Sequence, residues 1–191
     1  MNSYKPSSEL SLVTQKYLKT YRCILNDMIK GMTCAKLTDS ISYNFMVQMI
    51  PHHRAAIEMC QNLLQYTTCI PLQNIAEGII AEQTRSIADM EEILCSCGRQ
   101  RNSGQDLNCF QNKMNRIMET MFTDMENACS DNQLNANFMR EMIPHHRGAV
   151  EMSKNALQYN ICPGLIPILN AIIASQERGI CQMEELLREI S

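Results

Sequence analysis

One segment occurs twice in the chain, and this repeat constrains the fold more than any other feature. Residues 44–66 read NFMVQMIPHHRAAIEMCQNLLQY, and residues 137–159 read NFMREMIPHHRGAVEMSKNALQY, at a constant offset of 93 and without a gap. Both copies contain Pro-His-His-Arg, with Met-x-x-Met before it and Glu-Met after it, and all four histidines of the chain lie in these copies. A repeat of this kind predicts two equivalent halves.

Apolar residues recur at helical spacing throughout both halves, which predicts an all-α fold. We expect helices over about residues 9–32, 40–66, 72–95, 107–129, 135–159 and 165–190, with Pro6-Ser7-Ser8 starting the first and Asp39 or Ser40 capping the second. No segment shows the sustained alternation of a strand. The expected architecture is a helical bundle of about six helices in two pseudo-symmetric halves.

The expected organisation follows the repeat. Residues 1–98 would form the first half, with the His52-His53 motif, and residues 105–191 the second, with the His145-His146 motif. Residues 99–104 are polar and end in Ser-Gly, which is typical of a linker. We expect the two halves to form one compact domain.

Charge and hydropathy narrow the choice of partners. The net charge of −3 and the absence of Lys/Arg runs argue against nucleic acid as a partner. No apolar stretch approaches the length of a membrane span, so we expect no membrane association. The first residues lack the apolar core of a signal peptide, which predicts a cytoplasmic location. These observations are compatible with a homo-oligomer.

The chain has ten cysteines, which without an export signal are expected to be mostly free thiols or metal ligands. Their spacing matches no zinc ribbon. Only Cys69 and Cys162 correspond at the offset of 93, whereas six methionines in each half have a counterpart in the other. The duplicated set is therefore histidine and methionine. The cysteines are most simply small buried apolar residues, although Cys60, seven residues after His53, could join a soft site.

Helical geometry places His53 on the apolar face of its helix, together with Met46 and Met49. His52 is rotated by about 100° and shares the edge of that face with Met49 and Met59. Adjacent histidines on a helix cannot easily chelate one ion alone, so each needs donors a turn away or from another helix. Met90 lies at such an inward position on the following helix.

Thioether and imidazole together form a soft ligand set that suits Cu(I) and Ag(I) better than Zn(II), Mg(II) or Mn(II). The candidate metal ligands are His52, His53, Met46, Met49, Met59, Met90, His145, His146, Met139, Met142, Met152 and Met183. Methionines at helical spacing are also common core filler, and inward histidines can be core groups, so a structural interpretation remains.

Acidic residues of the motif bear on two further interpretations. A di-iron site needs paired carboxylates, but Glu141 has Gln48 at the equivalent position of the first copy, which argues against that chemistry. Arg54 and Arg147 could pair with the glutamates four residues on, in a structural role.

The motif FMxxMIPHHRxAxEM, followed by a helix with Gln83 and Met90 or Gln176 and Met183, resembles the bacterial family catalogued as domain of unknown function number 305. The resemblance covers about residues 40–95 and 114–189. It implies a ferritin-like bundle of two-helix repeats, copper or silver binding as in some members, and the histidines and methionines above as ligands. The chain departs from the family where a glutamate usually follows the glutamine, since Ser86 and Gly179 stand there.

These observations favour a non-enzymatic protein that sequesters Cu(I) or Ag(I) on histidine and methionine ligands. No nucleophile with an adjacent base can be identified, and we name no catalytic residue. The alternatives are a purely structural or coat-like bundle and, less favoured, a di-iron protein of ferritin or hemerythrin type.

Overall fold

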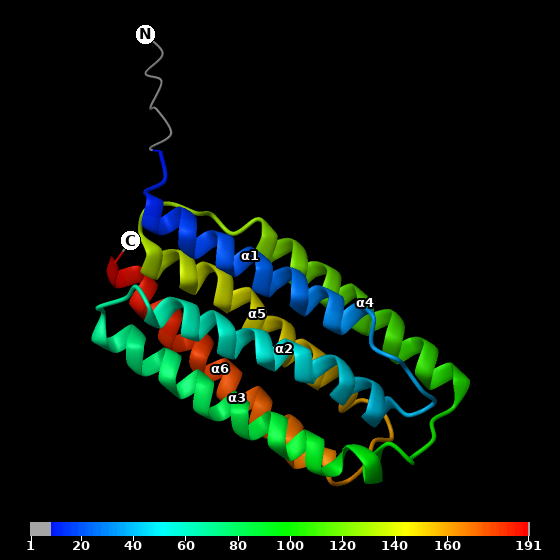
Figure 1. The fold of residues 1–191 in the computed structure, drawn as a ribbon. Coiled ribbons are helices and arrows are strands. Elements are labelled where there is room, and N and C mark those ends of the chain that lie inside the picture. Colours follow the sequence, from blue (N-terminus) through cyan, green and yellow to red (C-terminus); the bar gives the residue numbers. More distant parts are fainter. Residues whose placement is uncertain (1–8, 191) are drawn as a thin grey trace.

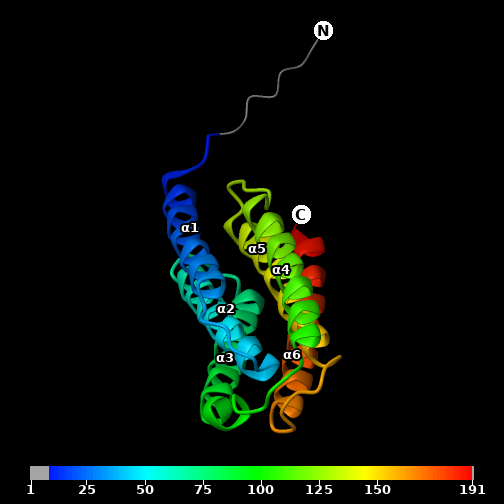
Figure 2. The same ribbon diagram turned by 90° about the vertical axis from the view of Figure 1, so that its right-hand side faces the viewer.

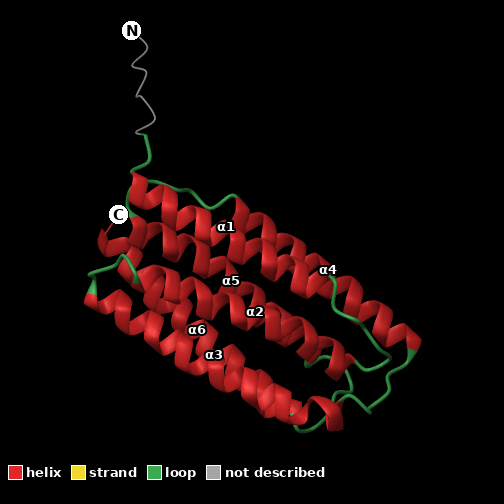
Figure 3. Cartoon of the chain, in the orientation of Figure 1, coloured by secondary structure: helices red, strands yellow, loops and turns green. Residues whose placement is uncertain are grey.

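The computed structural model describes residues 9–190, which form six α-helices and no strand (Figures 1 and 3). The predicted helix start at Pro6-Ser7-Ser8 lies outside the described residues. None of these six helices combines the length and the apolar character that crossing a membrane requires. The helices are α1 (Leu12–Thr33), α2 (Ile41–Leu64), α3 (Ile70–Cys97), α4 (Gly104–Glu126), α5 (Leu134–Ala156) and α6 (Leu165–Ile190).

Three of the helices are capped at their N-terminus by a serine. Its hydroxyl accepts a hydrogen bond from a backbone N–H that has no partner within the helix. Ser11 Oγ accepts from Thr14 N at 3.1 Å, and Ser40 Oγ accepts from Tyr43 N at 3.3 Å. Such a cap contributes about 1 kcal/mol. The prediction that Asp39 or Ser40 caps the second helix is confirmed for Ser40.

The helices lie in three layers of two, with α1 and α4 on one side, α2 and α5 in the middle, and α3 and α6 on the other side (Figures 1 and 2). Successive helices pack within each half, and α2 on α5 and α3 on α6 join the halves. Buried residues make up 16 of the 24 positions of α2 and 16 of the 23 of α5, but only 6 of the 28 of α3. The duplicated motif therefore occupies the central layer.

Equivalent contacts recur in the two halves at the offset of 93. Asn62 Nδ2 donates to Tyr17 O at 3.2 Å, and Asn155 Nδ2 donates to Phe110 O at 3.2 Å. Through these buried side-chain amides, each central helix is hydrogen-bonded to the outer helix that precedes it in the sequence. The duplication in sequence thus corresponds to a duplication of tertiary contacts.

The two arginines of the motif also pair equivalently, but not with the partners that helical spacing suggested. Arg54 Nη2 lies 2.8 Å from Glu91 Oε1, and Arg147 Nη2 lies 2.6 Å from Glu184 Oε1. The expected i, i+4 pairs are therefore wrong, because a neighbouring helix packs within reach of each guanidinium. All four side chains are exposed, so each pair contributes at most about 1 kcal/mol.

The segment between α3 and α4 is anchored to both halves. Asn102 N donates to Asp39 O at 2.9 Å, and Asn102 Oδ1 accepts from Ile41 N at 2.9 Å. Asn102 Nδ2 donates to Asn160 O at 2.7 Å. The linker thus covers the start of α2 and the loop before α6.

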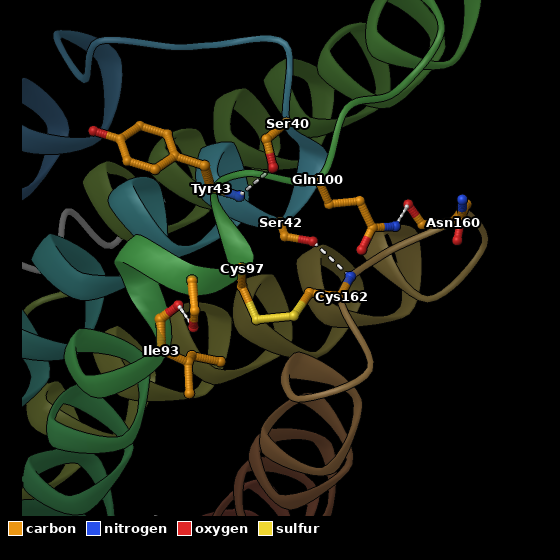
Figure 4. Close-up of a disulfide and its surroundings, with 9 residues drawn as sticks. Ser40, Ser42, Tyr43, Ile93, Cys97, Gln100, Asn160 and Cys162 are labelled. Carbon is orange, nitrogen blue, oxygen red and sulfur yellow. Dashed lines mark hydrogen bonds between the residues drawn. A yellow bond between two sulfur atoms is a disulfide. The ribbon is translucent and has the colours of Figure 1, made fainter.

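A disulfide beside this segment joins Cys97 at the end of α3 to Cys162 in the loop before α6, with Cα atoms 5.2 Å apart (Figure 4). Ser42 Oγ accepts from Cys162 N at 2.9 Å and helps to position the loop. The other eight cysteines are free. The sequence suggested mostly free thiols and did not identify this pair, since Ile190 stands at the position equivalent to Cys97.

Candidate metal centre

All twelve candidate ligands lie in the core. None of the four histidines or the eight methionines is more than 1 % exposed. They come from the two central helices, with Met90 and Met183 added by α3 and α6. Burial supports the inward orientation that was predicted for His53, and His146 at the equivalent position is buried likewise.

The rings of His52 and His145 meet where α2 packs on α5. They are stacked, with ring centroids 3.6 Å apart. His52 Nε2 lies 3.2 Å from His145 O, and His145 Nε2 lies 3.1 Å from His52 O. Since a carbonyl oxygen can only accept, each Nε2 must carry the proton and donate. This reciprocal pair links the two halves at their equivalent residues.

The other two histidines face the outer helices α3 and α6. His53 Nε2 lies 3.1 Å from Ser86 Oγ of α3. A Cβ atom added to Gly179 of α6 would lie 2.9 Å from His146 Cδ2, so the missing side chain leaves room for that ring. The ring centroid of His53 lies 5.8 Å from that of His52, and the corresponding distance between His146 and His145 is 5.9 Å.

The prediction that His52 occupies only the edge of the buried face is therefore incomplete. An edge position would follow if α2 buried a single face, as a surface helix does. Because α2 lies in the middle layer, it packs against α1, α3 and α5. His53 consequently faces α3, whereas His52 faces the contact with α5.

Burial keeps all four rings neutral. Loss of hydration lowers the pKa of His53 to about 3, helped by the nearby His145, and lowers the pKa of His145 to about 4. The same cause, with the neighbouring rings second, holds the pKa values of His52 and His146 well below the usual range. A neutral imidazole is the form that binds a metal ion.

The Nδ1 atoms of all four histidines are buried and have no hydrogen-bond partner. In His52 and His145 the proton resides on Nε2, so Nδ1 carries an unused lone pair. Buried polar atoms without partners are uncommon and require an explanation. The free lone pairs of His52 and His145, together with the methionine sulfurs buried in the same core, form a donor set that fits a soft ion.

The described residues 9–190 contain no cluster of three or more His, Cys, Asp or Glu side chains that could hold a metal ion. A site in this core would thus depend on methionine sulfur in addition to imidazole nitrogen. That requirement is consistent with a soft monovalent ion and inconsistent with the ordinary ligand set of zinc.

The carboxyl group of Glu141 in α5 is buried and has no equivalent in the other half. Tyr17 Oη donates to Glu141 Oε2 at 2.6 Å, while Glu141 Oε1 has no partner. Burial raises the pKa of Glu141 to about 8, although the hydrogen bond from Tyr17 acts in the opposite direction. Gln48 stands at the equivalent position, so the central layer does not offer the paired carboxylates of a di-iron protein.

Sequence reasoning missed Ser86 as a partner of His53 and the contact between Tyr17 and Glu141. Both lie at positions where the halves differ, since Ser86 corresponds to Gly179 and Glu141 to Gln48. The sequence showed both differences, but which residues Ser86 and Glu141 contact depends on how the helices pack.

A model of the family described as domain of unknown function (DUF305) matches residues 42–187, and the chain belongs to this family. Among solved structures the chain is similar to the DUF305 fragment from Deinococcus radiodurans. The TM-score is 0.58 at 23 % identity, over 78 % of this chain and 96 % of that chain, which shows a common fold. No curated protein matches the chain.

Proposed function

We propose that this protein is a non-enzymatic binder that sequesters a soft metal ion, Cu(I) or Ag(I), in its central layer. The observation that carries the proposal is the pair His52 and His145. Each ring donates its Nε2 proton to a backbone carbonyl and keeps a free lone pair on Nδ1. Metal-binding histidines commonly donate their second ring N–H in this way, which orients the ring and raises its basicity.

The remaining donors of the proposed site are methionines that come from the same helices. Met49 and Met142 lie three residues before His52 and His145, and therefore on neighbouring positions of the same helix face. Thioether sulfur is polarisable and uncharged, so it stabilises a soft monovalent ion and contributes little to a harder divalent one. The proposed ligands also include His53 and His146.

A structural role is the second candidate, and the same hydrogen bonds favour it. The reciprocal contact between His52 and His145 joins the two halves without any ion. Under this alternative the methionines are core filler, and the unpartnered Nδ1 atoms are tolerated at a cost in stability.

Matched methionine variants separate the two candidates. The test variant is Met49→Leu with Met142→Leu, and the control is Met32→Leu with Met125→Leu, a second buried pair at the same offset on α1 and α4. Each exchange roughly conserves volume and should change stability by less than about 1.5 kcal/mol. Affinity is measured anaerobically against a Cu(I) chelator after the exposed thiols have been alkylated.

The proposal expects the test pair to weaken Cu(I) binding and the control pair to leave it unchanged. Equal affinity in both pairs, or no binding by the parent protein, would favour the structural role.

A further inference from the structure

A pocket of about 570 Å³ lies between α1 and α4, the two helices of one outer layer (Figures 1 and 2). Gln48 of α2 is part of its wall, and we call it the Gln48 pocket. Pockets of about 300–1,000 Å³ commonly hold small organic molecules. Gln48 and Met118 are buried, Ile29 and Phe122 are half-buried, and Glu119 is exposed. The lining therefore extends from the surface to the buried side chain of Gln48.

The side-chain amide of Gln48 has one unused atom. Gln48 Nε2 donates to Met32 O at 3.3 Å, and since a carbonyl oxygen can only accept, this contact defines the orientation of the amide. Gln48 Oε1 is buried and has no hydrogen-bond partner among the described residues. A buried acceptor without a partner in the wall of a pocket indicates that a guest donates to it.

The offset of 93 relates this pocket to a smaller one further along the same two helices. The smaller pocket, of about 260 Å³, includes Arg22, and we call it the Arg22 pocket. Four of its residues, Leu18, Arg22, Leu25 and Asn26, correspond to Gln111, Asn115, Met118 and Glu119 of the Gln48 pocket. The two pockets can therefore be compared position by position.

In the half with the Arg22 pocket, the chain itself supplies partners for the buried polar group at the equivalent position. That group is the carboxyl of Glu141, and Tyr17 Oη donates to its Oε2 at 2.6 Å. Burial raises the pKa of Glu141 to about 8, while the hydrogen bond from Tyr17 and the positive charge of Arg22 act in the opposite direction. Glu141 thus interacts with a phenol hydroxyl and with a cation.

The sequence provides neither partner at the equivalent positions around the Gln48 pocket. Phe110 stands at the position of Tyr17 and has no hydroxyl. Asn115 stands at the position of Arg22 and has no charge. A guest with a hydroxyl donor and a positive charge would therefore supply from outside what Tyr17 and Arg22 supply in the other half.

The charge and the apolar surface of the Gln48 pocket indicate the rest of the guest. Among the described residues that line it, the charged side chains are Glu119 and Glu126, and both are exposed. Carboxylates that line a pocket without a basic residue attract a positively charged group. Ile29, Leu37 and Phe122 offer an apolar wall, and an aromatic ring packs favourably against a phenylalanine.

We propose that the Gln48 pocket binds a small arylalkylamine whose ring carries a hydroxyl group. The hydroxyl donates to Gln48 Oε1, the ring packs against Phe122, and the ammonium group lies at the exposed edge near Glu119 and Glu126. None of the residues that line this pocket is a proposed metal ligand, so the inference is independent of the proposed function.

Three compounds of similar size test the two polar contacts on the parent protein. Tyramine carries the phenol hydroxyl and the ammonium group, phenethylamine lacks the hydroxyl, and para-ethylphenol lacks the ammonium group. Titration of isotopically labelled protein, followed by two-dimensional NMR, gives the dissociation constant and identifies the backbone amides that shift. Tyramine should bind with a Kd of about 1 mM or below, as a ligand of its size allows.

Phenethylamine should bind about tenfold more weakly than tyramine, because Gln48 Oε1 would remain unpaired. Loss of the ammonium group in para-ethylphenol should weaken binding by about threefold to tenfold, since attraction to exposed carboxylates is modest. The variant Gln48→Leu should remove the difference between tyramine and phenethylamine. Glu119→Gln with Glu126→Gln should remove the difference between tyramine and para-ethylphenol.

The matched control is Asp27→Asn with Asp124→Asn, an equal change of charge on exposed residues of α1 and α4 outside the Gln48 pocket. It should preserve the difference between tyramine and para-ethylphenol, and loss of that difference in the control would overturn the assigned ammonium contact. The comparison of compounds on the parent protein decides the proposal even where Gln48→Leu does not fold. Equal affinity for all three compounds, shifts confined to amides outside α1, α2 and α4, or no binding of tyramine would overturn it.

Discussion

Lowering the pH from 7 to 5 should destabilise the folded protein because its buried histidines cannot take up protons. A histidine in the unfolded chain has a pKa near 6.5, whereas burial lowers that of His53 to about 3 and that of His145 to about 4. The unfolded state thus binds more protons in this window. The stability that depends on neutral rings is present above pH 6.5 and is lost as the pH falls toward the folded-state values.

The expected magnitude follows from linkage. At pH 5 each of these two rings should have lost about 2 kcal/mol of stabilisation, or about 4 kcal/mol together. His52 and His146 act in the same direction. Glu141 opposes them, because its raised pKa makes its contribution grow by about 2 kcal/mol as the pH falls over the same range. The net effect is a loss of stability toward acid.

Urea unfolding followed by circular dichroism at pH 5, 6 and 7 measures this loss. The variant His53→Gln keeps a side chain that can hydrogen-bond to Ser86 but cannot be charged. It should lose about 2 kcal/mol less than the parent protein between pH 7 and pH 5. If both proteins lose the same amount, His53 is not buried and neutral in the folded state, and the reasoning fails.

Three further expectations concern other parts of the fold. Glu141→Gln should raise the midpoint of thermal unfolding at pH 9, because the stability associated with the protonated carboxyl is lost as the pH rises through about 8; an unchanged difference between pH 6 and pH 9 would contradict this. Cys162→Ser should lower the free energy of unfolding by up to about 4 kcal/mol, since the disulfide closes a loop of 65 residues; a loss below about 1 kcal/mol in urea titrations would show that Cys97 and Cys162 are not joined in solution. Arg54→Ala should cost less than about 1 kcal/mol in the same titrations, because its ion pair is exposed; a larger loss would show packing by the arginine stem.

The sequence predicted the architecture because the repeat and the helical periodicity are local signals. Helical spacing of apolar residues placed six helices within a few residues of their ends. The cap of α2 was narrowed to Asp39 or Ser40 because capping is confined to one turn, and Ser40 is the residue that caps. The equivalence of the halves followed from the offset, since equal sequences form equal contacts, as with Asn62 and Asn155.

The features that were missed depend on which helices become neighbours. His52 reaches the backbone of His145 only because α2 packs on α5 across the two halves. The disulfide likewise joins residues from different halves, and no spacing rule connects Cys97 with Cys162. Arg54 pairs with Glu91 of α3 because the packing of the helices places that carboxylate within reach. Glu58, four residues after Arg54 on the same helix, satisfies the spacing for an ion pair within one helix but is not the partner.

The most direct test of the central claim is anaerobic competition between Cu(I) and Zn(II) for the intact protein with its exposed thiols alkylated. The histidine rings of the central layer are neutral, and the other proposed donors are thioethers, so Cu(I) should bind tightly and excess Zn(II) should fail to displace it. The same experiment with Met49→Leu and Met142→Leu should show weaker Cu(I) binding. Displacement of Cu(I) by Zn(II), or no Cu(I) binding at all, would contradict a soft-metal site built from these histidines and methionines.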